Sequence, residues 1–550
     1  MLRCQLVNRR FRSIIESMLR QYRAWLKANA LTNVEDSQIP LKDRRKMLLR
    51  YHRAWESLSP EGTSPPGLSF YPISTHIPSR QPSPLVLESG WVVVSDFRGG
   101  LSFLKLSTIS SPDGRSNRNA WSMKKQLTSS QLPPGLMTYQ FDPSQDLLIC
   151  LAVINPDENP KIVVVSMSTG GQPHPQAGLP IFDSGIEEVD EINSLRVHKG
   201  LVALYAGADD ERVLQVWNWK TGKLLMMKEN FDAWGDTVTF VGDNVLLLAQ
   251  EDILHLFIFD LDGLSCTCDL RLPRFSQDAG VQLWTTVSSP FSSAPAPGHA
   301  FAPDSADSIV VVNMARAVPG TDAGTKCSLL LAIRLAGLMA QARRALLARP
   351  AADTDTDIDT NVSAPAMPTP TPTPFKLGVP WAQWGPAHTR FVVVPETWEA
   401  PSTFGRRCAL AYHTAAGAPE LALFDFGVDA PEVVMGAHAY ALGAGWSAEV
   451  LPAPAAVDMR LWFEDEDEAW VESELPCRVR RRRLPPEDGE QKVVAAMLWE
   501  DGIILKTSRG YQCDYVSMSL HAQPPALAAG PPISQLPPAP LLPAPSRGSV

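Results

Sequence analysis

Residues 213–225, VLQVWNWKTGKLL, decide the fold of this chain. The first half of the stretch alternates apolar and polar residues, a pattern typical of a half-buried β-strand. A Thr-Gly turn at residues 221–222 follows it, and a second apolar strand begins at Leu224. The stretch therefore predicts a β-hairpin in which Trp217 and Trp219 face a core.

Strand–turn units of this kind recur along the chain from about Leu68. Phe259 follows Trp217 by 42 residues, and both lie in apolar strands followed by polar turns with glycine. A period of about 40 to 45 residues is that of a four-stranded propeller blade. We therefore expect a mainly β protein in which residues 68–515 form a β-propeller-like body of about seven divergent blades. A pair of β-sandwiches is the alternative, and the repeat length disfavours it.

The hairpin at residues 213–225 resembles the third-strand, turn and fourth-strand segment of WD-repeat blades. In this chain Trp217-Asn218 stands where a Trp-Asp pair is usual, and no Gly-His pair opens the repeat. The resemblance therefore implies a divergent WD-repeat-like propeller, a closed ring that leaves few exposed strand edges.

The composition agrees with a β-rich chain. The 550 residues include 49 prolines, about 9% against a usual value of about 5%, and proline disfavours long helices. The longest apolar stretch, residues 328–340, is interrupted by Arg334 and is too short to span a bilayer. No secretory signal segment opens the sequence. Eight scattered cysteines lack the dense spacing of a disulfide framework, so we expect reduced thiols and a cytoplasmic or nuclear location.

Three segments are expected to interrupt or follow the blades without forming structure. They are rich in Ser, Ala, Thr, Asp or Pro, and they cannot bury enough apolar area to offset chain entropy. These segments are residues 288–308, 350–374 and the tail 521–550. Between the first two, residues 336–349 predict a helix with one apolar side, formed by Leu338, Ala342, Ala345 and Leu346.

The N-terminal part has a different pattern from the body. Residues 1–58 carry a net charge of +8, and the rest of the chain carries −18. The apolar residues here recur three or four positions apart, which predicts helices over 1–30 and a linker helix within 31–60, with the basic residues on solvated faces. This periodicity disfavours a nucleic-acid-binding function for the basic residues. The apolar stripes need a cover, either packing within the helical pair or a partner protein. They consist of Val7, Phe11, Ile14, Ile15, Met18, Tyr22, Trp25 and Leu26 in the first helix and Met47, Leu48, Tyr51, Trp55 and Leu58 in the second.

Motifs that carry chemistry are missing from the sequence. It contains no phosphate-binding loop, dinucleotide fingerprint, nucleophile elbow or HExxH zinc motif. Cys266 and Cys268 are too close for the usual zinc spacing, and Cys408 with His413 lacks an orienting third group. The acidic run 464–468 and the basic run 478–483 are expected to neutralise each other in neighbouring loops. We therefore predict a non-enzymatic protein with no cofactor and no metal.

The stretch LRCQLVNRRFRSII, residues 2–15, resembles the second half of an F-box, as found in fungal F-box proteins. Residues 43–58 and the segment VPWAQWGP at 379–386 also resemble segments of fungal members, whose bodies are β-rich and propeller-like. In that family the box follows a Leu-Pro-x-Glu helix, which this sequence does not contain. We expect either that the coding sequence extends upstream of Met1 or that docking is weak or absent.

The F-box resemblance implies a function. F-boxes dock on the Skp adaptor of a cullin ubiquitin ligase, and the body of the protein holds the target. The chain is accordingly expected to be a non-catalytic substrate receptor, with Val7, Phe11, Ile14 and Ile15 in the box core or on its adaptor-facing surface. A propeller scaffold with a vestigial F-box is the alternative. No membrane association is expected, and the sequence does not identify the target protein.

Overall fold

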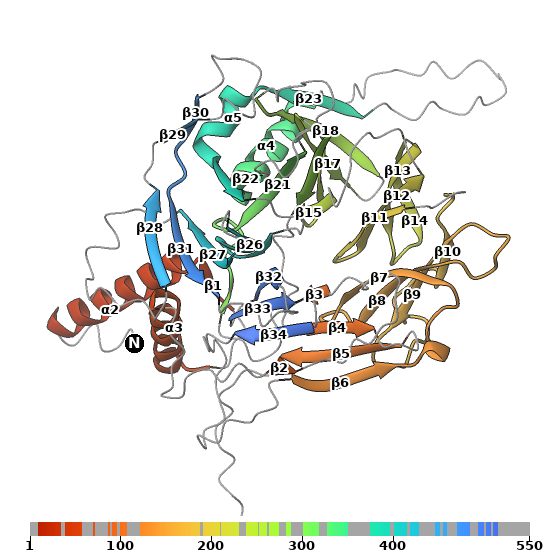
Figure 1. The fold of residues 1–550 in the computed structure, drawn as a ribbon, viewed down its shortest axis with the longest axis horizontal. Coiled ribbons are helices and arrows are strands. Elements are labelled where there is room, and N and C mark those ends of the chain that lie inside the picture. Colours follow the sequence, from red (N-terminus) through yellow and green to blue (C-terminus); the bar gives the residue numbers. More distant parts are fainter. Residues whose placement is uncertain are drawn as a thin grey trace, which may run out of the picture.

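The computed structural model is a ring of small antiparallel sheets with a pair of helices at one side (Figure 1). It describes residues 9–34, 39–57, 70–71, 86–88, 91–95, 100–106, 121–186, 191–208, 211–229, 238–250, 252–260, 263–273, 282–287, 301–317, 327–349, 374–395, 401–414, 418–427, 446–451, 455–458, 470–484, 493–499, 502–507 and 510–514. The described part contains seven sheets of four or five strands, which we number as blades 1 to 7 along the chain. The predicted propeller of about seven blades is confirmed, and the alternative pair of β-sandwiches is wrong.

The first three blades follow one another along the chain without an inserted element, apart from a 3₁₀ turn at Ser129–Gln131. Blade 1 contains β3 (Val86–Glu88), β4 (Trp91–Ser95), β5 (Leu101–Leu106) and β6 (Trp121–Leu127). Blade 2 contains β7 (Leu136–Asp142), β8 (Leu147–Ala152), β9 (Lys161–Ser166) and β10 (Ile181–Asp183). Blade 3 contains β11 (Glu191–His198), β12 (Leu201–Ala208), β13 (Glu211–Asn218) and β14 (Lys223–Glu229).

The next three blades carry the inserted segments. Blade 4 contains β15 (Val238–Gly242), β16 (Val245–Gln250), β17 (Ile253–Phe259), β18 (Leu264–Arg271) and a parallel outer strand, β23 (Phe375–Val379). Blade 5 contains β19 (Gln282–Val287), β21 (Ile309–Ala317), β22 (Cys327–Arg334) and β24 (Thr389–Pro395). Blade 6 contains β25 (Ser402–Phe404), β26 (Arg407–His413), β27 (Pro419–Phe426), β31 (Cys477–Arg483) and the outer β28 (Trp446–Leu451).

The ring is closed in blade 7 by strands from distant parts of the chain. Blade 7 contains β32 (Val493–Trp499), β33 (Gly502–Thr507), β34 (Gly510–Asp514) and β2 (Phe70–Tyr71). Phe70 pairs with Gln512 and Tyr71 pairs with Tyr511 in an antiparallel register. An early segment thus supplies the fourth strand of the last blade, and this pairing joins the two ends of the sheet array.

Separate apolar cores lie between neighbouring blades. Strands such as β8 are buried along their whole length, so both of their faces contribute to packing. Six apolar clusters each join two consecutive blades, from the pair of blades 1 and 2 to the pair of blades 6 and 7. This arrangement explains the continuous apolar runs of the sequence, because a blade inside the ring is covered on two sides.

The hairpin at residues 213–225 forms the outer half of blade 3. Trp219 is fully buried and donates from Nε1 to the carbonyl of Lys199 at 2.7 Å. Asn218 replaces the usual Asp, and its Oδ1 accepts a hydrogen bond from the backbone N of Lys220 at 3.0 Å. Gly222 has a φ of 73°, which favours glycine in this turn. The predicted turn is confirmed.

Inserts from blades 5 and 6 fold onto the ring. One contains α4 (Leu335–Ala348) and α5 (Trp381–His388), and the other contains the hairpin β29 (Ala455–Asp458) and β30 (Trp470–Ser473). The helix predicted over 336–349 is confirmed as α4. Leu346, expected on its apolar side, is instead 40% exposed, because Leu335 and Leu338 occupy the face that packs on blades 4 and 5.

The expectation that residues 288–308 lack structure is wrong for its last part. Phe301–Pro303 forms β20, which pairs with β1 (Leu31–Asn33). Phe301 is 1% exposed, so its burial stabilises the pairing. The 350–374 insert, apart from Pro374, and the 521–550 tail lie outside the described residues.

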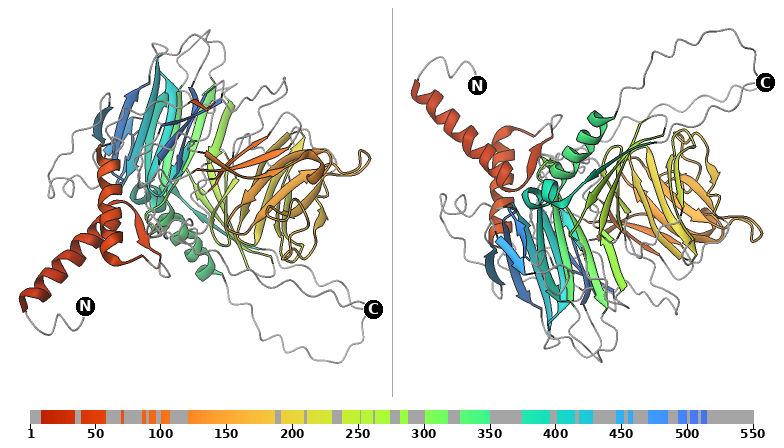
Figure 2. Two further views of the ribbon diagram at one scale, coloured as in Figure 1. Left: turned by 90° about the horizontal axis from the view of Figure 1, so that it is seen from below. Right: turned by 90° about the horizontal axis from the view of Figure 1, so that it is seen from above.

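The N-terminal elements, which we call the head, comprise α2 (Arg9–Ala28), β1 and α3 (Leu41–Ser57). The expected linker helix over 31–60 differs at its start, because residues 31–33 form a strand on β20. Figure 2 shows α2 extending away from the blades toward its N-terminal end, while its C-terminal end and α3 lie against them. Among the described helices, none has the length and apolar character needed to cross a membrane.

Candidate functional site

The apolar stripe of α3 is covered by the chain's own blades. Leu48, Tyr51 and Trp55 are at most 1% exposed, and they share a cluster with Leu423 of blade 6 and Leu498 of blade 7. The sequence left two covers open, packing within the helical pair or a partner protein. The structure provides the first of these covers in part and adds a third, because Tyr22 and Leu26 of α2 share the cluster and blades 6 and 7 pack on the same stripe.

Two arginines of blade 6 hold the head in place. The Arg407 guanidinium lies 4.4 Å from the ring centroid of Trp55, and it donates to Tyr51 Oη at 3.1 Å and to Asn29 Oδ1 at 3.2 Å. Arg480 donates from Nη1 to the carbonyl of Trp55 at 2.6 Å. Hydrogen bonds from charged groups in a buried setting are stronger than neutral ones. The polar contacts therefore fix the orientation of the apolar face.

A single buried carboxylate lies among these arginines. Asp425 Oδ1 is 2.7 Å from Arg406 Nε, and its Oδ2 is 3.5 Å from Arg407 Nε. Burial alone raises the pKa of Asp425, but the charges of Arg406, Arg407, Arg480 and Arg478 outweigh burial and lower that pKa to about 2. Asp425 is therefore ionised, and it pairs with Arg406 and Arg407, both of which contact the head. Arg406 Nη2 also donates to the carbonyl of Ala28, near the end of α2.

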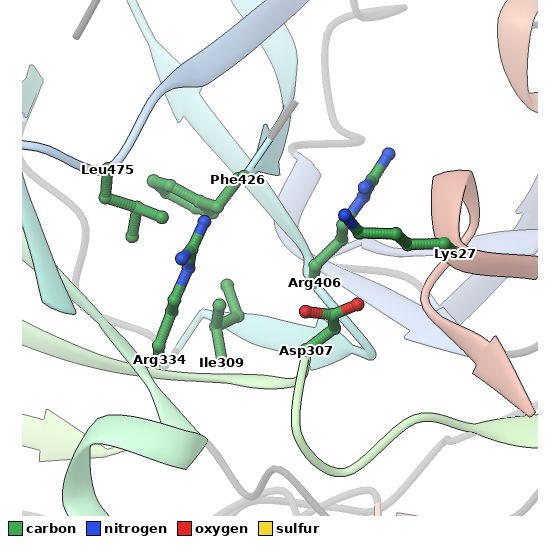
Figure 3. Close-up of a pocket in the computed structure, with 8 residues that line it drawn as sticks. Lys27, Asp307, Ile309, Arg334, Arg406, Phe426 and Leu475 are labelled. Carbon is green, nitrogen blue, oxygen red and sulfur yellow. The ribbon is translucent and has the colours of Figure 1, made fainter. Parts of the chain in front are cut away.

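A cavity of about 230 Å³ opens beside this junction (Figure 3). Its charged lining comes from α2, the turn before β21, the end of β22 and the β25–β26 turn, which place Lys27, Asp307, Arg334 and Arg406 around one space. Arg334 lies on one side of Asp307, and Lys27 and Arg406 lie on the other (Figure 3). The remaining lining is mostly apolar and consists of Ile309, Phe426, Gly427 and Leu475.

Three of the four residues predicted to contact an adaptor lie in the outer part of α2. Val7 lies outside the described residues. Phe11 and Ile14 lie on the described backbone of α2, and the side chain of Ile15 is half-buried. The structure thus brings three of the four onto one helix and leaves their contact with an adaptor as a prediction.

The remaining sequence candidates are structural. Cys408 lies in the core between blades 5 and 6, where burial raises the pKa of its thiol, whereas His413 is exposed at the end of the same strand. Burial raises the pKa of the Cys268 thiol to about 12, and Cys266 shares its apolar cluster. Such thiols are poor nucleophiles. In the part of the chain described, no group of three or more His, Cys, Asp or Glu side chains could hold a metal.

The basic run 478–483 is a strand and not a solvated loop. Arg478 and Arg480 are at most 5% exposed, and Arg481 pairs with Glu449 of β28 at 2.8 Å. β28 thus supplies a partner for Arg481, and the expected neutralisation of the basic run by the acidic run stays a prediction. The acidic run 464–468 itself lies outside the described residues.

The VPWAQWGP segment, residues 379–386, is anchored to the blades by its buried residues Val379, Trp384 and Gly385. Trp384 is 1% exposed and donates from Nε1 to the carbonyl of Arg271 at 3.0 Å. The hydroxyl of Thr389 donates to the carbonyl of Gly385 at 2.8 Å. These contacts tie the start of α5 to blades 4 and 5, so the segment serves packing.

The charged residues of the junction were missed at the level of the sequence. Asp425 gave one signal, because it stands within the apolar strand LALFDF at 421–426 and an isolated acid there requires a buried partner. The sequence contains no signal for Lys27, Asp307 and Arg334. They line one cavity only because the fold brings together segments some 300 residues apart in sequence.

No protein-family model and no curated protein matches this chain. Solved structures that match include the C-terminal WD40 domain of Sif2, at 9% identity and a TM-score of 0.32, covering 78% of this chain and 95% of that one. Hsv2 of Kluyveromyces lactis with loop 6CD replaced by a Gly-Ser linker matches at 8% identity and a TM-score of 0.31. This match covers 77% of this chain and 87% of that one. Drosophila Plexin A in complex with Semaphorin 1b matches at 9% identity and a TM-score of 0.36, covering 78% of this chain and 84% of that one. The fold assignment depends on the strand order and ring closure of this chain, and not on these likenesses.

Proposed function

We propose that this chain is a non-catalytic substrate-recognition subunit of an SCF-type ubiquitin ligase. In this proposal the outer half of α2 docks on the Skp-type adaptor, and the propeller binds a target protein. The observation that carries the proposal is the division of α2 into two parts. Tyr22 and Leu26 are buried against the rest of the molecule, whereas Met18, one turn earlier, is 43% exposed.

The apolar stripe of α2 continues beyond the region that the body covers. Ile15 stands seven residues before Tyr22 and therefore shares its face, and Phe11 and Ile14 continue the same spacing. An apolar helix face that leaves the body is a suitable surface for a partner helix to cover. These are also the residues that carry the F-box resemblance.

The body would hold such an adaptor at a defined position. Because α3 is fixed between blades 6 and 7, the direction of α2 is set by the ring. A target bound to the propeller would then stand at a constant distance from the conjugating machinery. The mechanism is a tether, which raises the effective concentration of target near the ligase and requires no catalytic residue in this chain.

The proposal is tested by measuring the affinity of the purified chain for a Skp-type adaptor. The protein is prepared both from Met1 and with any in-frame residues encoded upstream. Ile15→Glu is expected to weaken binding by at least about tenfold, because it places a carboxylate in the apolar contact. Ser13→Glu, at an exposed position on the same helix, is the matched control. Equal affinities for the two variants, or no binding by either form of the chain, would exclude adaptor docking.

A second candidate is a propeller scaffold whose F-box is vestigial. The burial of Tyr51 and Trp55 favours it, because these large aromatic residues are taken up by the body and are not free for a partner. A scaffold would bind its target without recruiting a cullin. Recovery of ubiquitin-ligase subunits together with the target would exclude this candidate.

A further inference from the structure

Within the part of the chain that the structure describes, the cavity beside the head has cations without a neutralising partner. The described residues provide no ion pair for Lys27 or Arg334 and no hydrogen bond to the carboxylate of Asp307. Arg406 is different, because Asp425 and the carbonyl of Ala28 already engage it. Three cationic side chains line the cavity, and Asp307 and Asp425 are the two carboxylates beside them. The net charge of these five groups is therefore +1.

The size and walls of the cavity limit what can enter it. Its volume of about 230 Å³ is below the roughly 300 to 1,000 Å³ of pockets for drug-sized ligands. A single side chain therefore fits better than a nucleotide-sized molecule. Ile309, Phe426 and Leu475 also line the cavity next to the cations, and because each is only 1% exposed they offer a narrow apolar surface. This combination suits a short apolar stem that ends in an anionic group.

Gly427 keeps one side of the cavity open. Its φ is +76°, and a Cβ at this position would stand 3.1 Å from Arg334 Nη2. Gly427 therefore allows the Arg334 guanidinium to lie against the backbone at the end of β27. Arg334 lines the cavity, and a guanidinium can present two parallel donors to one carboxylate.

The geometry points to a binding site for the carboxylate of an acidic side chain, a glutamate or aspartate of a partner polypeptide. Arg334 would hold the carboxylate, Lys27 would add positive charge from the other side of Asp307, and the narrow apolar surface would contact the methylene stem. Asp307 disfavours a doubly charged group, since it leaves only one net positive charge to be neutralised. This inference is independent of adaptor docking, because the cavity lies at the inner end of α2 and the proposed adaptor surface at its outer end.

Two substitutions with opposite expected effects test the site in the full chain. The probe is the capped tripeptide acetyl-Ala-Glu-Ala-amide, and its affinity is measured by calorimetric or NMR titration. Arg334→Gln is expected to weaken binding by about tenfold, the effect of one charge-assisted hydrogen bond. Asp307→Asn is expected to strengthen binding severalfold, because it removes the repelling carboxylate. Arg343→Gln removes an exposed arginine of α4 that does not line the cavity, and it is the matched control.

Further probes distinguish the ligand's chemistry. Acetyl-Ala-Gln-Ala-amide has the same shape without the charge and is expected to bind at least about tenfold more weakly. Propionate carries the carboxylate and stem alone and is expected to bind more weakly than the glutamate tripeptide. Absence of saturable binding of that tripeptide, equal binding of the Gln tripeptide, or equal affinities of Arg334→Gln and Arg343→Gln would overturn the proposal. Propionate binding as tightly as the tripeptide would overturn the assignment to a polypeptide.

Discussion

The two helices of the head look alike in the sequence but have different surroundings in the fold. Both carry apolar residues at helical spacing, and both are rich in Lys and Arg. The described part of the α3 stripe lies under blades 6 and 7, whereas the described apolar side chains of α2 are buried only toward its C-terminal end, at Tyr22 and Leu26. An amphipathic pattern therefore specifies that a face needs a cover, and it does not specify which part of the molecule, or which partner, provides it.

The difference lies in the polar groups that surround each helix. Trp55 of α3 has Arg407 over its ring and Arg480 at its carbonyl. The outer part of α2, at Met18, is exposed. Burial of α3 thus stabilises the ring and the head together, while the outer part of α2 can be changed without affecting the ring.

The largest expected effect belongs to the centre of the buried stripe. Trp55→Ala should lower the free energy of unfolding by about 3 to 5 kcal/mol, the cost of removing a fully buried Trp side chain. Denaturation by guanidinium, followed by circular dichroism, measures the change. Trp55→Phe is the control and should cost less, because it keeps most of the apolar volume. A loss below about 1 kcal/mol for Trp55→Ala would show that α3 is not seated on the blades.

Acid should loosen the same junction through Asp425. Because its pKa is lowered from 3.8 to about 2 in the folded state, its charge stabilises the fold above pH 4 and this contribution is lost as the pH falls toward 2. The shift corresponds to about 2 kcal/mol. In Asp425→Asn this part of the pH dependence of unfolding should be absent. An unchanged acid profile in the variant would contradict the buried charge cluster.

A smaller effect is expected when Arg407 is replaced by lysine. Arg407→Lys keeps the charge but cannot contact Tyr51, Asn29 and the Trp55 ring at once. We expect a loss of about 1 to 2 kcal/mol in the free energy of unfolding. Arg483→Lys, at an exposed position of the same blade, should be neutral. If Arg407→Lys and Arg483→Lys change the thermal unfolding temperature equally, the guanidinium geometry of Arg407 is unimportant for stability.

The smallest effect on stability is expected on the outer part of α2. Met18→Ser should change the free energy of unfolding by less than about 0.5 kcal/mol, because the side chain is 43% exposed. The same substitution should weaken adaptor binding, since Met18 continues the stripe of Ile15. Unfolding and adaptor titrations on one preparation test both statements. A large loss of stability would place this part of α2 on the body.

The propeller was predictable because its signals are local. The hairpin at residues 213–225 specifies strand, turn and strand, and the 42-residue spacing of Trp217 and Phe259 identifies the blade length. The closing strand, Phe70–Tyr71, was not predictable, because two residues of ordinary composition carry no sign of their partner. The strand β1 on β20 was missed for the same reason.

By itself, the sequence determined that this protein is a ring of small sheets with an amphipathic helical front part, since apolar periodicity and turn residues act over a few positions. Only the tertiary structure decided that blades 6 and 7 cover α3. It also decided that Arg407, Asp425 and Arg480 form one buried cluster, and that Lys27 and Arg334 meet at one cavity. The physical reason is that burial and charge pairing depend on which distant segments become neighbours, and local patterning does not specify this.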